Sequence, residues 1–215
     1  MDVSTQRAFS DGRLVVRTRV EAARPGRGED RVAVVGYAGG RAIVVADGAG
    51  GVSGGARAAE LLCSALSAEL SVPHEWSQWL RGCDLAMAEE VACGLAAAVV
   101  VSISDDGTVC GASVGDCEAW IFGAGEAVDL TGSQRRKPML GSGDAEPVAF
   151  TGRLGSGTLV MGTDGLWKYT GALSRIGQAA LRSLDDALAT MLDGVRLPSG
   201  TLQDDVGLAV CRRGD

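Results

Sequence analysis

The chain has 215 residues, of which 46% are hydrophobic and 22% charged, and its formal net charge is −7. This composition excludes a disordered chain, and the scattered lysines and arginines argue against a nucleic-acid-binding surface. Six cysteines without a Cys-x-x-Cys pair, together with a single histidine, argue against a zinc site. The N-terminus lacks a signal segment, and the longest apolar run, 95–101, is too short to cross a bilayer. We therefore expect a cytoplasmic protein that contacts neither nucleic acid nor membrane.

In the first half of the chain, the hydrophobic pattern predicts strands followed by two helices. Residues 1–12 are expected to form a loose segment, and residues 13–213 a single domain. Strands are expected at 14–20, 31–37 and 41–46, with a hairpin turn joining the last two. Helical periodicity covers 53–70 and resumes after Pro73, which breaks the helix. Two helices with so short a link are predicted to pack as an antiparallel pair.

The second half is predicted to be mainly antiparallel β-structure with one further helix. A meander is expected at 96–104, 108–114, 118–122 and 126–130, followed by an extended loop over the Gly-, Ser- and Pro-rich residues 131–157. A short strand at 158–162, a helical region at 173–195 and a final strand at 206–211 complete the chain.

Aspartates recur at the ends of the predicted strands. Asp47 and Asp164 each follow an apolar strand and precede a glycine, while Asp204 and Asp30 each stand just before a strand. The hairpin places Asp30 beside Asp47, and two adjacent carboxylates repel unless a cation or proton lies between them. Each acid alone is explained by an ordinary turn. Four at matching strand ends favour a site for Mg²⁺ or Mn²⁺, which prefer oxygen ligands.

Five motifs follow one another along nearly the whole chain. They are Glu29-Asp30-Arg31, Asp47-Gly48-Ala49-Gly50-Gly51, Ser113-Val114-Gly115-Asp116 continuing to Trp120, Gly162-Thr163-Asp164-Gly165-Leu166-Trp167, and Asp204-Asp205-Val206-Gly207-Leu208. In this order they resemble the motifs of the metal-dependent serine/threonine protein phosphatases of type 2C, in particular the compact bacterial members. A single motif would carry little weight, whereas five in sequence make the resemblance specific.

This resemblance implies an α+β fold, a four-layer α-β-β-α sandwich in which helices flank two stacked antiparallel sheets. It also implies two Mn²⁺ or Mg²⁺ ions at one end of the sandwich, and a shared water or hydroxide that attacks phosphoserine or phosphothreonine. Asp47 would bridge both ions with help from the Gly48 carbonyl, and Asp164 and Asp204 would hold the second ion. Glu29 and Asp30 would act nearby, partly through water. The three residues Asp47, Asp164 and Asp204 would thus carry catalysis.

The sequence also departs from the family pattern. Pro25 occupies the position of the usual phosphate-binding arginine, so we expect Arg24 to bind the substrate phosphate, with Arg27 as the alternative. The segment 94–97 lacks the usual hydroxyl residues, and the aspartate linked to a third ion has no clear match, so a third metal stays open. Asp116 is interpreted as a structural turn residue.

The expected function is hydrolysis of phosphorylated protein substrates, opposing a cognate serine/threonine kinase, by a protein that is a monomer. One alternative is a degraded relative that binds a partner or phosphopeptide without turnover. Another is a phosphatase dedicated to a phosphorylated antagonist in an anti-sigma-factor pathway.

Overall fold

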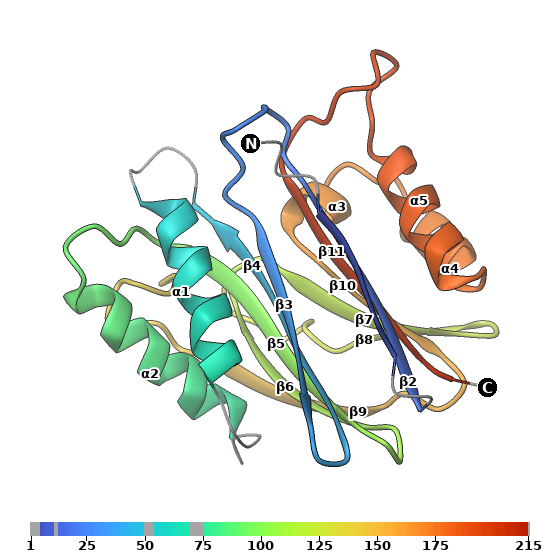
Figure 1. Ribbon diagram of the computed structural model, residues 1–215, viewed down its shortest axis with the longest axis horizontal. Helices are drawn as coiled ribbons and strands as arrows, with labels where there is room; N and C mark the ends of the chain where they lie inside the picture. The colour runs from blue at the N-terminus through green and yellow to red at the C-terminus, as the bar shows by residue number, and fades with distance from the viewer. Residues whose placement is uncertain (1–4, 11–12, 50–53, 69–74, 215) are drawn as a thin grey trace.

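The computed structural model describes residues 5–10, 13–49, 54–68 and 75–214. Two antiparallel sheets stack face to face (Figure 1). The six-stranded sheet has the order β1 (Thr5–Ser10), β2 (Leu14–Glu21), β11 (Val206–Arg213), β10 (Thr158–Gly162), β7 (Glu118–Gly123), β8 (Glu126–Asp129). The five-stranded sheet has the order β3 (Arg31–Tyr37), β4 (Gly40–Gly48), β5 (Ala96–Ser104), β6 (Thr108–Val114), β9 (Val148–Arg153).

Helices cover the outer face of each sheet. The first pair, α1 (Gly55–Ala68) and α2 (Trp76–Glu89), lies on the five-stranded sheet, with α1 against β3 and β4. The second pair, α4 (Leu173–Ala180) and α5 (Leu184–Gly194), lies on the six-stranded sheet, with α5 against β2 and β11. The single turn of α3 (Asp164–Trp167) follows β10. The predicted four-layer α-β-β-α sandwich is therefore confirmed.

Three apolar clusters hold these layers together. One lies between the two sheets, and each of the others lies between a sheet and its helices. β2 alternates buried and half-buried residues along its length, as expected for a strand with one face in the core. β5 is buried on both faces from Ala96 to Ile103, because a sheet covers one side and helices the other. The central strands are thus rigid supports for the residues at their ends.

Three local expectations are corrected by the structure. Residues 1–12 are not wholly loose, because Thr5–Ser10 pairs with β2 from Thr5↔Val20 to Ser10↔Val15. The predicted loop 131–157 contains β9, an edge strand that pairs with β6 and whose residues alternate between half-buried and exposed. The predicted helix 173–195 is two helices, and Ser183 begins the second by accepting a hydrogen bond from the Asp186 N–H at 3.2 Å.

The predicted meander is also wrong at one point, because β6 and β7 belong to different sheets. The chain crosses between them at residues 115–117, where Gly115 has a φ of 93°. A Cβ on Gly115 would lie 2.3 Å from the Ala97 Cβ, so both the conformation and the close approach require glycine. This crossing, rather than an ordinary hairpin turn, sets the position of Asp116.

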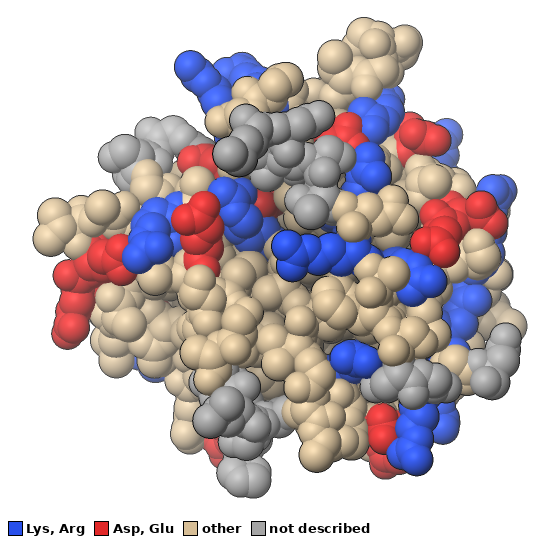
Figure 2. Space-filling model, in the orientation of Figure 1, with Lys and Arg blue, Asp and Glu red and all other residues tan. Residues whose placement is uncertain are grey.

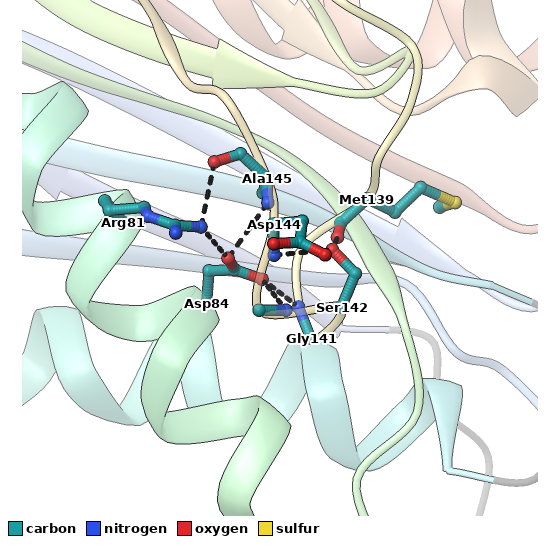
Figure 3. A network of polar contacts seen from close by, with 8 residues as sticks. Arg81, Asp84, Met139, Gly141, Ser142, Asp144 and Ala145 are labelled. Carbon is teal, nitrogen blue, oxygen red and sulfur yellow. Dashed lines mark hydrogen bonds and ion pairs between the residues drawn. The ribbon is translucent and has the colours of Figure 1, made fainter.

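The segment between β8 and β9 is fastened to α2 by one buried carboxylate, Asp84 (Figure 3). Its Oδ1 accepts hydrogen bonds from the N–H groups of Gly141 at 2.8 Å and Gly143 at 3.0 Å. Its Oδ2 accepts from the Ala145 N–H at 3.0 Å and from Arg81 Nη1 at 2.6 Å. Four donors thus satisfy the Asp84 carboxylate, which is fully inaccessible to solvent.

This fastened loop supports the end of β4. Leu140, inside the loop, exchanges two backbone hydrogen bonds of 3.0 Å with Ala96 at the start of β5. Ala96 in turn lies opposite Gly48 in the β4–β5 ladder, and the Ala49 N–H donates to the Leu95 carbonyl at 2.9 Å. The backbone that follows Asp47 is therefore held from its β5 side.

All six cysteines are free, with Cys117 and Cys211 buried and the other four partly buried. Free cysteines that are mostly shielded from solvent pack as small apolar side chains. Among the residues that the structure describes, no helix combines the length and apolarity needed to span a membrane. The charges on the face seen in Figure 2 are of both signs and interspersed.

Candidate metal centre

Five aspartates from five segments influence one another at the end of the sandwich where β4 and β10 finish. Asp47 is the second-last residue of β4, Asp30 directly precedes β3, and Asp164 begins α3 after β10. Asp204 precedes β11, and Asp116 lies in the crossing between the sheets. The register Arg31↔Ala46 places Asp30 beside Asp47, as the hairpin predicted. The structure thus brings together Asp30, Asp47, Asp164 and Asp204, the four strand-end acids singled out from the sequence.

The electrostatic centre of this group is Asp47. Burial raises the pKa of its carboxyl to about 7, and the nearby charges of Asp164, Asp116 and Asp204 contribute to the rise in that order. A hydrogen bond with Asp30 acts in the opposite direction. A carboxyl group with this pKa holds a proton near neutral pH unless a cation replaces it. Added positive charge beside Asp47 is therefore favourable.

Asp30 is the most deeply buried member, with 2% of its surface exposed. Burial, followed by the charge of Asp47, raises the pKa of Asp30 well above its usual range. The Thr163 hydroxyl donates a hydrogen bond to Asp30 Oδ2 at 2.7 Å and accepts one from the Gly207 N–H at 2.9 Å. Thr163 therefore links Asp30 to the segments that carry Asp164 and Asp204.

Asp164 stands at the first position of α3, where the helix N-terminus favours negative charge. Burial and the charges of Asp204 and Asp116 nevertheless raise its pKa. Lys168, one turn later, lies 3.6 Å from Asp164 Oδ2 and lowers that pKa, while the pKa of the lysine itself is raised. Asp204 is half-buried, and its Oδ1 accepts a 3.1 Å hydrogen bond from the Asp205 N–H.

Glu29 and Gly48 lie at the junction with α1. The Glu29 carboxylate accepts a hydrogen bond from the Ala56 N–H in the first turn of α1, although burial outweighs this bond and raises the pKa of Glu29. A Cβ on Gly48 would lie 2.3 Å from the Gly55 carbonyl oxygen, so this approach of β4 to α1 requires glycine. Glu29 thus contacts the helix N-terminus directly, a role that the sequence did not predict. Gly50 and Gly51, the last two residues of the motif that begins at Asp47, lie outside the described residues.

Arg24 is exposed on the loop between β2 and β3, as is Arg27. The two arginines line a hollow of about 660 Å³ together with Asp204 and Gln203. This hollow therefore connects the loop to the acidic group. Basic side chains project from the end of the molecule where this loop lies (Figure 2).

Two residues of the region were not assigned to it from the sequence. Asp116 was interpreted as a turn residue, yet its charge raises the pKa values of both Asp47 and Asp164. Asp205 holds the β2–β3 loop, because its two oxygens accept from the N–H groups of Ala23 at 2.8 Å and Glu29 at 2.7 Å. A signal for Asp205 was present, since it directly follows Asp204 in the fifth motif.

The donor chemistry of this region fits hard divalent cations. All its side-chain ligand atoms are carboxylate oxygens, and burial together with their mutual repulsion raises the pKa values of Asp30, Asp47 and Asp164. Within the ranges that the structure describes, no three His, Cys, Asp or Glu side chains are close enough to form a complete metal site. Binding of an ion would therefore draw the carboxylates closer together than they lie here.

The sequence matches one protein-family model over most of its length. The model of Stage II sporulation protein E (SpoIIE) matches residues 38–214, which include Asp47, Asp116, Asp164 and Asp204. The chain belongs to this family. Its SpoIIE-type domain is a phosphatase domain of type 2C, so the resemblance read from the five motifs is confirmed.

Solved structures agree with this SpoIIE-type fold. RsbX in complex with magnesium has a TM-score of 0.77 at 14% identity, and the match covers 97% of this chain and 100% of RsbX. The serine/threonine phosphatase PstP/Ppp of Mycobacterium tuberculosis has a TM-score of 0.74 at 18% identity, covering 93% and 98%. A protein of the bacterial stressosome has a TM-score of 0.73 at 20% identity, covering 93% and 99%. No curated protein matches the sequence significantly.

These comparisons also confirm the predicted class of activity, a protein serine/threonine phosphatase. One of these neighbours, RsbX, was solved with magnesium.

Proposed function

We propose that this chain hydrolyses phosphoserine and phosphothreonine in proteins with the help of two Mg²⁺ or Mn²⁺ ions. Asp47 would bridge the ions, the Gly48 carbonyl would complete the coordination of one, and Asp164 and Asp204 would hold the other. Asp30 and Glu29 would support them from the β3 side. The observation that carries this proposal is the raised pKa of Asp47, to about 7, among the like charges of Asp164, Asp116 and Asp204.

The protein's part in the reaction is to position charge. Ions bound at this site would activate a water molecule for in-line attack and screen the negative charge of the phosphate. Asp30, whose oxygen is fixed by the Thr163 hydroxyl, would orient that water. Arg24 would hold the phosphate by paired N–H donors. Ala49, which follows Gly48, has no acidic side chain that could donate a proton. Water would therefore protonate the leaving serine or threonine oxygen.

A direct test is the hydrolysis of para-nitrophenyl phosphate with and without MnCl₂. The wild-type protein is expected to show turnover that depends on the metal, and Asp204→Asn is expected to lose nearly all of it. A matched control is Asp193→Asn, since Asp193 lies on the exposed side of α5 with 77% of its side chain accessible. Wild-type protein without metal-dependent turnover would contradict the proposal.

A binding module without turnover is the second candidate. It is favoured by the absence of a ready-made metal site among the described residues and by the apolar segment 94–97, which lacks the family's hydroxyls. This candidate predicts phosphopeptide binding with equal affinity in the presence and absence of Mn²⁺. The same turnover assay separates the two functions.

We further propose that the substrate is a phosphoprotein of a bacterial signalling pathway, such as the phosphorylated antagonist of an anti-sigma factor, and that a cognate kinase opposes the enzyme. The support is the likeness to RsbX and to a protein of the bacterial stressosome. The expected state is a monomer in the cytoplasm. Dephosphorylation of a candidate antagonist by the purified chain, followed by mass spectrometry, tests this assignment.

A further inference from the structure

The loop between β2 and β3 contains a tight turn with an arginine at each end. Residues 24–27 read Arg-Pro-Gly-Arg, and the Arg27 N–H donates a 3.1 Å hydrogen bond to the Arg24 carbonyl. Gly26 has a φ of 73°, and the ring of Pro25 fixes the preceding φ. Proline followed by glycine at the two central positions is the pattern of a type II turn, which brings its end residues within about 7 Å of each other. The two arginines are therefore close neighbours.

Both arginine side chains are exposed and available for a ligand. Neither makes a hydrogen bond or ion pair with any residue that the structure describes. By contrast, Arg31, a few residues later, is paired with Glu60 and donates to the carbonyls of Gly28 and Asp30. The turn thus carries two uncompensated positive charges on a protein whose formal net charge is −7.

One carboxylate fastens both ends of this loop. Asp205 Oδ1 accepts from the Ala23 N–H at 2.8 Å, and Asp205 Oδ2 accepts from the Glu29 N–H at 2.7 Å. The chain also packs tightly here, since a Cβ on Gly28 would lie 2.8 Å from the Ala22 Cβ. A loop held in this way loses little conformational entropy when its arginines bind a ligand. Asp205 is therefore a positioning residue for the turn.

The turn opens onto a hollow that also reaches two of the proposed metal ligands, Glu29 and Asp204. Arg24, Arg27 and Asp204 line a space of about 660 Å³. A substrate phosphate that enters this space would be held by one guanidinium through a bidentate contact. The second guanidinium is then left for another anion on the same substrate.

We infer that residues 24–27 form a two-arginine clamp that selects substrates with a second anionic group next to the phosphorylated residue. This inference rests on the proposed phosphatase function and extends it to substrate choice. Arg24 holds the phosphate that is hydrolysed, and Arg27 holds the second group. Its chemistry is that of a carboxylate or a further phosphate, supplied by a neighbouring acidic or phosphorylated residue.

The test compares peptides that differ only beside one phosphoserine, where they carry alanine, glutamate or a second phosphoserine. Wild-type kcat/KM is expected to be about tenfold higher for the glutamate peptide than for the alanine peptide, as one charge-assisted hydrogen bond allows. A still larger ratio for the doubly phosphorylated peptide would identify phosphate as the better second group. Equal rates for all three peptides would overturn the inference.

Arg27→Ala is expected to reduce the glutamate-to-alanine ratio to about one, because the charge that contacts the second group is gone. A matched control is Arg153→Ala, since Arg153 is exposed on β9 beside Thr108, at the opposite end of β6 from Asp116, and should keep the wild-type ratio. A ratio unchanged in Arg27→Ala would contradict the clamp. Failure of the phosphatase function itself is seen separately, as absent metal-dependent turnover of para-nitrophenyl phosphate by the wild type.

Asp205→Asn tests the positioning role. The amide nitrogen of asparagine cannot accept a hydrogen bond, so one of the two contacts that hold the loop is lost. We expect KM for the glutamate peptide to rise several-fold more than KM for the alanine peptide. An equal rise for both peptides would show that Asp205 does not act through the turn.

Discussion

Carboxylates are shielded from solvent in two regions of this molecule, and the two regions surround them with groups of opposite character. In α2, Asp84 is fully buried and faces three backbone N–H groups and the guanidinium of Arg81. At the strand ends, Asp30 is buried and Asp47 is partly buried, and both lie near other carboxylates. Burial first, and then these neighbouring charges, raise their pKa values. A buried charge whose hydrogen-bond donors are all in place stabilises a fold, whereas like charges that lie close together favour the binding of a cation between them.

The largest expected effect is on activity, and it follows from a change at the strand-end carboxylates. Asp47→Asn is expected to lower turnover of para-nitrophenyl phosphate by about 10³-fold, since losing ~4 kcal/mol of transition-state stabilisation corresponds to three powers of ten. The metal-free variant should unfold at a higher urea concentration than the wild type, because one repulsive charge is gone. A loss of both activity and stability would mean that Asp47 is a structural acid like Asp84.

The second effect is on the stability of the fold, and it follows from a change at Asp84 in α2. Asp84→Ala removes the acceptor of three backbone N–H groups and the carboxylate partner of Arg81, which keeps only the Ala145 carbonyl. The free energy of unfolding is therefore expected to fall by about 3 kcal/mol. Urea denaturation measures this change. The control Asp193→Ala, on the exposed side of α5, should stay within about 0.5 kcal/mol of the wild type. Equal effects of the two variants would contradict the structural role of Asp84.

The third effect is the combined dependence of stability on metal binding and pH. Since the pKa of Asp47 in the folded, metal-free protein is raised to about 7, the stability that this group contributes is present below its ordinary pKa and is lost as the pH rises through about 7. Mn²⁺ replaces the proton, and at a hundred times its dissociation constant it adds about 2.7 kcal/mol.

Thermal unfolding with and without MnCl₂ checks this linkage. The increase in Tm should be larger at about pH 8 than at about pH 5.5, where protons compete with the ion. The variant Asp47→Asn serves as the control and should show little shift at either pH. A larger Mn²⁺ shift at the lower pH would have the wrong sign for the account.

The smallest effect is expected at Asp116. Asp116→Asn removes one of the charges that raise the pKa of Asp47, so that pKa should fall and Mn²⁺ affinity should decrease about tenfold, or ~1.4 kcal/mol. Calorimetric titration with MnCl₂ measures the affinity. Asparagine is as suitable as aspartate in a tight turn, so a purely structural Asp116 would leave the affinity unchanged.

The sequence predicted most of the elements that position the metal centre because their signals are local. The apolar strand before Asp47, the hairpin that places Asp30 beside it, and the glycines after Asp47 and Asp164 are all visible in a short window. β1 and β9 were missed because each is stabilised by its partner in the fold, β2 and β6, rather than by its own pattern.

The residues of the site and of its supporting loops that the sequence did not reveal were missed for the same physical reason. Asp116 owes its place to the crossing of the chain between the two sheets, and no local pattern distinguishes such a crossing from a hairpin turn. Asp84 and Asp205 act on backbone N–H groups that are 57–61 and 176–182 residues away in the sequence. The split between α4 and α5 was predictable, because Ser183 and Asp186 have the spacing of a helix cap.

Calorimetric titration of the wild-type protein with MnCl₂ at about pH 8 tests the central claim most directly. The account predicts uptake of two ions by the wild type and loss of this uptake in Asp47→Asn. Uptake that is absent, or that persists unchanged in Asp47→Asn, would contradict it.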